Sequence, residues 1–86
     1  KKVRINANKP KEKEGWLAFG NLPKKFKGVG ISLSKKKCLK ESAKNLYTML
    51  RILDNQNISS IAVQKIPKKG LGLAINDRLE RASHEE

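Results

Sequence analysis

The chain has 86 residues, with 20 lysines and arginines against eight acidic residues, and a formal net charge of +12 at pH 7. This length allows one small domain with one core and excludes a catalytic cleft between two lobes. A single cysteine excludes an internal disulfide, and a single histidine argues against a metal site of the zinc type. Without an apolar run long enough for a bilayer, we expect a soluble, cytoplasmic protein with no membrane partner.

Six elements are predicted in the order β β β α β α. Residues 3–7 alternate apolar and polar, with Val3, Ile5 and Ala7 on one covered face. The runs GWLAFG, VGISLS and IAV each predict a short buried strand. Apolar residues with helical spacing predict one helix before IAV, along Leu39, Ala43, Leu46, Tyr47, Leu50 and Leu53. A final helix is predicted from Leu71, Ala74, Ile75, Leu79 and Ala82.

A strand, a helix and a second strand form a βαβ crossover, which implies parallel strands. The sequence therefore predicts an α/β domain with a mostly parallel sheet of about four strands and two helices. The predicted core contains Leu46, Leu50, Ile61, Val63, Ile75 and Leu79.

Two glycines, Gly70 and Gly72, precede the final helix. They do not form a dinucleotide fingerprint, because Ile75 stands where the third glycine is needed. One interpretation is that their backbone amides are free to bind an anion at the helix start. The interpretation that we favour is structural: Gly70 ends the connection and Gly72 permits close packing.

No set of catalytic side chains can be assembled from the sequence. His84 lies near a terminus, and Cys38 has no histidine or acid placed to work with it, so capping or helix packing is its expected role. Phe26 is the one aromatic residue flanked by lysines, which is a weak signal for nucleic-acid binding. We therefore predict that the 86-residue chain alone is not an enzyme.

Lysines cluster where the predicted strands end. If the strands ending near residues 20, 34 and 66 are parallel, eight lysines and both helix starts share one edge of the sheet, where open α/β sheets bind ligands. We hypothesise that this edge meets a phosphate-bearing ligand, tRNA or an acidic protein surface, and the alternative is a solvated scatter of lysines. The candidate residues are Lys24, Lys25, Lys27, Lys35, Lys36, Lys37, Lys68 and Lys69, with Gly70 and Gly72.

The segments LAFG, ISLS, ESAKNLYTMLRILD and IAVQKIPKKGLGLAINDRL occur in this order along nearly the whole chain. In order and spacing they resemble the C-terminal accessory domain, called the Sua-five domain, of the longer threonylcarbamoyl-AMP synthases. The residues that match the characteristic positions of this family include Asn45, Arg51, Asp54, Asn76 and Arg78. Departures from the family pattern are the lysines 35–37 before the first helix and Cys38 at its N-cap position.

The resemblance implies a small Rossmann-like accessory domain, with residues 1–14 as linker end and first strand and 15–84 as the core. It further implies an upstream YrdC-type catalytic domain in the same polypeptide, which converts L-threonine, bicarbonate and ATP to threonylcarbamoyl-AMP and pyrophosphate for threonylcarbamoyladenosine synthesis in tRNA. ATP is then a substrate of the parent enzyme, and no cofactor is expected in this fragment. A basic module that contacts tRNA, ATP or pyrophosphate is the alternative.

Overall fold

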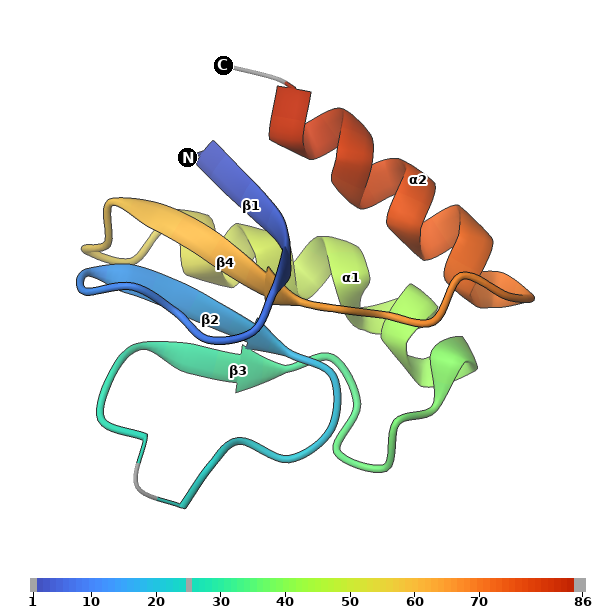
Figure 1. Ribbon diagram of the computed structural model, residues 1–86, viewed down its shortest axis with the longest axis horizontal. Coiled ribbons are helices and arrows are strands. Elements are labelled where there is room, and N and C mark those ends of the chain that lie inside the picture. Colours follow the sequence, from blue (N-terminus) through green and yellow to red (C-terminus); the bar gives the residue numbers. More distant parts are fainter. Residues whose placement is uncertain (1, 25, 85–86) are drawn as a thin grey trace.

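The computed structural model describes residues 2–24 and 26–84, which form a four-stranded sheet and two helices (Figure 1). The strands are β1 (Lys2–Ala7), β2 (Glu14–Ala18), β3 (Gly30–Ser32) and β4 (Ser60–Gln64), and the helices are α1 (Leu39–Asp54) and α2 (Leu71–His84). The sheet order is β1-β4-β2-β3, and every neighbouring pair is parallel. The predicted α/β class and the order β β β α β α are confirmed.

The main core lies between the sheet and the two helices. It contains Leu17 of β2 and Ile61 and Val63 of β4. These residues are buried because both faces of the two central strands are covered. From the helices, Leu53 and Leu79 are almost completely inaccessible. Of the six predicted core residues, five are buried and Leu50 is half-buried, packed against the margin of the cluster.

The buried faces of the helices differ from the predicted apolar stripes. On α1 the core face includes Ser42, whereas Ala43 and Tyr47 are exposed, Tyr47 to 68%. On α2 the buried residues are Gly72, Ile75, Asn76 and Leu79, and the predicted Leu71 and Ala74 are exposed. The predicted stripes were wrong at these four apolar positions, because small or polar residues occupy part of the buried face of each helix.

A bulge in β1 moves one predicted residue to the other face of the sheet. Asn6 has a φ of 55°, and the pairing of β1 with β4 shifts between Arg4 and Ala7. An irregularity of one residue reverses the face to which later side chains point. Val3 packs with the main core, but Ala7 joins a second cluster on the opposite face, so the prediction of one face for both was wrong.

The sheet face away from the helices is covered by connecting segments. Trp16, Ala18 and Ala62 on this outer face are buried, and Leu22 and Phe26 from the 19–29 connection pack against them. The Phe26 ring also fills the space that a side chain at Gly30 would need. Phe26 therefore has a packing role in the fold, which explains why a lone aromatic stands among the lysines.

Candidate functional site

The parallel strands bring two loops and both helix starts to one edge of the sheet. We define the carboxyl edge as residues 34–41, between β3 and the first turn of α1, and residues 65–72, between β4 and the first turn of α2 (Figure 1). The two segments touch, because Leu39 Cδ2 lies 3.4 Å from the point that a Cβ on Gly72 would occupy. The segments that carry the predicted lysines 35–37 and 68–69 are thus neighbours.

Ser34 organises the first segment of the carboxyl edge. Its carbonyl accepts hydrogen bonds from the amides of Gly20 (2.8 Å) and Lys37 (3.2 Å), and its Oγ accepts one from the Cys38 amide at 2.9 Å. Lys37 has a φ of 58°, and its side chain lies over Gly20. Cys38 caps α1 by accepting a hydrogen bond from the Glu41 amide at 3.5 Å, which confirms its predicted N-cap position.

The second segment is held by close backbone packing. A Cβ at Gly72 would lie 1.9 Å from the Pro67 carbonyl oxygen, so no larger residue fits there without movement. Gly70 has a φ of 53°, which a glycine adopts without strain. The Gly72 amide donates to the Lys69 carbonyl oxygen at 2.8 Å and is not free. These contacts agree with the structural interpretation of the two glycines.

Asn45 and Asn76 connect the helices to the ends of the strands. Asn45 Nδ2 donates to the Leu33 carbonyl oxygen at 3.0 Å, just beyond β3. The buried Asn76 donates through Nδ2 to the carbonyl oxygens of Ile66 (3.0 Å) and Gly72 (2.7 Å). Both side-chain amides thus donate to backbone carbonyl oxygens beyond the ends of the strands, where a neighbouring strand no longer supplies a hydrogen-bond donor.

The other residues that carry the resemblance lie on the helix surfaces. The Arg78 guanidinium stacks over the Tyr47 ring at 5.6 Å from its centroid, which links α2 to α1. Arg51 is exposed in the last turn of α1, which Asp54 ends. His84 is exposed at the end of α2. These positions place Arg51, Asp54 and Arg78 away from the carboxyl edge.

Lys24 and Lys27 do not share the carboxyl edge. The 19–29 connection leaves the end of β2 and returns to the start of β3 at the opposite edge, as parallel pairing of these strands requires (Figure 1). The Phe26 amide donates to the Pro23 carbonyl oxygen in a turn, and the Phe26 ring packs on the outer face. The predicted gathering of all lysine clusters at one edge was therefore wrong for Lys24 and Lys27, and Lys25 lies outside the described residues.

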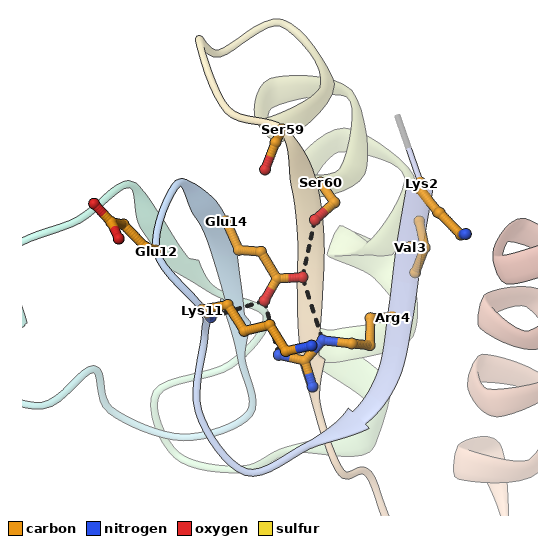
Figure 2. A pocket seen from close by; sticks show the side chains of 8 residues that line it. All are labelled: Lys2, Val3, Arg4, Lys11, Glu12, Glu14, Ser59 and Ser60. Carbon is orange, nitrogen blue, oxygen red and sulfur yellow. Dashed lines mark hydrogen bonds and ion pairs between the residues drawn. The ribbon is translucent and has the colours of Figure 1, made fainter.

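A second polar site, a pocket of about 380 Å³, lies on the outer face at the other end of β1, β4 and β2 (Figure 2). The Glu14 carboxylate, whose side chain is 6% exposed, accepts hydrogen bonds from Arg4 Nε (3.2 Å) and Nη2 (2.7 Å). It also accepts hydrogen bonds from the Lys11 amide (2.8 Å) and Ser60 Oγ (2.9 Å). These four donors engage both carboxylate oxygens.

The same contacts set the protonation of this pair. Hydrogen bonds from Arg4 lower the pKa of Glu14 from 4.5 to about 2, against the opposing effect of burial. The hydrogen bond to Glu14 likewise raises the pKa of Arg4. Glu14 is therefore a fixed anion near neutral pH and is not poised to exchange a proton.

Periodicity and motifs in the sequence do not predict the Arg4–Glu14 pair. β4 lies between β1 and β2, so the two side chains reach each other over Ser60 from strands that are not adjacent. Arg4 Nη2 also donates to the Lys9 carbonyl oxygen at 3.0 Å, which holds the 8–13 connection across the outer face. A charged residue within β1, opposite the face that packs on the helices, was the one available signal.

Two general features of the described residues bear on function. Histidine, cysteine, aspartate and glutamate side chains nowhere gather in groups of three or more that could hold a metal ion, as far as residues 2–24 and 26–84 are concerned. Over the same residues, neither helix has the length and apolar character needed to cross a membrane.

Comparison with known proteins places the similarity over almost the whole chain. Residues 1–84 match the family model described as "Threonylcarbamoyl-AMP synthase, C-terminal domain". A threonylcarbamoyl-AMP synthase from Pyrococcus abyssi is 40% identical over 45 residues, which cover 52% of this chain and 13% of that protein. The chain thus corresponds to a small part of the relative's length. No solved structure is a significant match.

Proposed function

Because the chain belongs to the family of threonylcarbamoyl-AMP synthase C-terminal domains, we propose that it is a noncatalytic accessory domain. In this proposal it docks on a YrdC-type catalytic domain of the same polypeptide and regulates or closes it. The catalytic domain converts L-threonine, bicarbonate and ATP to threonylcarbamoyl-AMP and pyrophosphate. That product serves threonylcarbamoyladenosine synthesis in tRNA, and the parent enzyme is cytoplasmic.

The observation that supports a noncatalytic role is the use of preorganised polar groups to hold the fold. Cys38 Sγ accepts a capping hydrogen bond, and the Glu14 carboxylate is occupied by Arg4, Lys11 and Ser60. Asn45 and Asn76 bind backbone carbonyl oxygens. A general acid, general base or nucleophile needs a poised group within reach of a substrate, and these side chains are already engaged.

The first experiment measures pyrophosphate and threonylcarbamoyl-AMP formation by the purified 86-residue chain with L-threonine, bicarbonate and ATP. We expect no product above a reaction without protein, whereas the parent polypeptide forms both products under the same conditions. Product formation by the chain alone, surviving further purification, would show that the domain is itself catalytic.

The second experiment tests regulation. The parent polypeptide is compared with a form that lacks residues 1–84, with and without the separate chain added in trans. We expect deletion to change the rate or the substrate dependence of threonylcarbamoyl-AMP formation, and addition of the chain to restore part of it. Identical kinetics of the full and deleted forms would contradict an accessory role in this reaction.

A further inference from the structure

The positive charge of the chain is concentrated on the carboxyl edge. Its two segments contain seven lysines and one acidic residue, Glu41. The lysines are Lys35, Lys36, Lys37, Lys40, Lys65, Lys68 and Lys69. Half of the net charge of +12 therefore lies on two short loops and the helix starts that they lead into.

These ammonium groups are available to a partner. All seven residues are exposed, and none of them forms an ion pair with a carboxylate of the described residues. Both helices begin at this edge, so the positive ends of their dipoles add to the potential of the lysines. The first turn of α2 has no acidic residue that would offset it.

The composition of the edge favours a polyanion over a protein partner. The residues that contribute most to binding at protein interfaces are enriched in tryptophan, tyrosine and arginine, and the carboxyl edge contains none of these. The exposed Tyr47, Ile52 and Leu73 lie on α1 and α2 outside it, which leaves Leu71 as its one exposed large apolar residue among those described. Lysine is a hydrated point charge on a flexible stem, suited to phosphates whose positions vary.

We propose that the carboxyl edge binds the phosphate backbone of RNA without reading its sequence. The choice of RNA among polyanions rests on the proposed function, since the parent reaction serves tRNA. Binding of this kind is driven by release of counterions from the nucleic acid, so its affinity falls steeply with salt. Without stacking aromatics at the edge, affinity should depend little on base composition.

The test measures binding of the 86-residue chain to fluorescently labelled unmodified tRNA and to labelled polyuridylate, by anisotropy between 50 and 200 mM salt. The edge variant carries Lys35→Gln, Lys36→Gln, Lys68→Gln and Lys69→Gln. A matched control carries Lys2→Gln, Lys9→Gln, Lys11→Gln and Lys13→Gln, which removes the same charge from exposed residues outside the edge. Thermal melting of all three proteins checks that they remain folded.

We expect the edge variant to bind both RNAs at least tenfold more weakly at about 100 mM salt, and its log–log salt slope to fall by about 3, as four lost phosphate contacts predict. The control should lose less than about a third of that slope. Equal losses in the two variants would show that net charge alone is responsible and would overturn the proposal.

A competition experiment separates RNA from acidic protein. Polyglutamate at the same charge concentration should displace labelled tRNA poorly, and displacement as effective as that by unlabelled tRNA would also overturn the proposal. None of these measurements involves the catalytic domain, so failure of RNA binding is distinguishable from failure of the accessory role.

Discussion

Protonation of Glu14 should destabilise the domain in acid. A carboxyl group whose pKa is lower in the folded than in the unfolded state stabilises the fold above the unfolded pKa, and this contribution is lost as pH falls through the folded pKa. For Glu14 the two values are about 2 and 4.5, so the window lies between about pH 5 and pH 2. The difference corresponds to about 3 kcal/mol, of which about 2 kcal/mol is lost by pH 3.

The assay is urea unfolding of the native chain and of Glu14→Gln at pH 7, 5 and 3. Gln keeps an oxygen for Lys11 or Ser60 but removes the charge that Arg4 requires. We expect the variant to be less stable by about 2 to 3 kcal/mol at pH 7, and by about 1 kcal/mol at pH 3. Glu12→Gln, a change at an exposed neighbour, is the control. Parallel pH profiles of the native and Glu14→Gln proteins would refute the argument.

Two further predictions concern packing, and both are measured by urea unfolding at pH 7. Leu53→Ala, at a residue with no exposed surface, should cost about 2 to 5 kcal/mol, whereas Tyr47→Ala should cost less than about 1 kcal/mol. The reverse order would mean that the core face of α1 is wrongly placed. Gly72→Ala should cost about 1 to 3 kcal/mol, because its Cβ would meet the Pro67 carbonyl oxygen. A Gly72→Ala variant with nearly the same free energy of unfolding as the native protein would contradict this close packing of α2 on Pro67.

The elements of the fold follow from local patterns, but their arrangement in the sheet does not. Periodicity located both helices and the first strand, and short continuous apolar runs located the other three strands, because each pattern reflects burial of its own segment. The position of β4 between β1 and β2 depends on contacts between distant segments. The bulge at Asn6 was equally hidden, since asparagine tolerates a positive φ without requiring one.

The helix faces show where an apolar pattern misleads. The stripe predicted for α1 included the exposed Tyr47 and left out Ser42. Ser42 is fully buried, and its Oγ has no hydrogen-bond partner among the described residues. On α2, Gly72 is buried because it packs directly on the backbone of Pro67. Asn76 is buried because its side-chain amide binds a backbone carbonyl oxygen. A reading based on apolar residues alone cannot include such positions.

The parts of the candidate site that could be predicted are those whose position follows from the direction of the strands. Parallel strands fix where a loop starts, so lysines directly after β3 and β4 were placed correctly at one edge. A long connection can leave that edge again, as the one with Lys24 and Lys27 does to cover Trp16. Arg4 and Glu14 could not be paired from sequence, because their contact requires the sheet order.

In the carboxyl edge, the residues that hold the backbone in place are different from the lysines that could bind RNA. Ser34 and Asn76 hold its backbone by hydrogen bonds, and Asn45 binds the carbonyl of the residue just before the edge. Gly72 sets the distance between α2 and the 65–70 connection. The lysines contribute charge without taking part in those contacts through their ammonium groups. Lys37 differs, because its stem lies on Gly20, and it was therefore kept out of the edge variant. Loss of binding in that variant would then report on charge at a surface whose backbone has not changed.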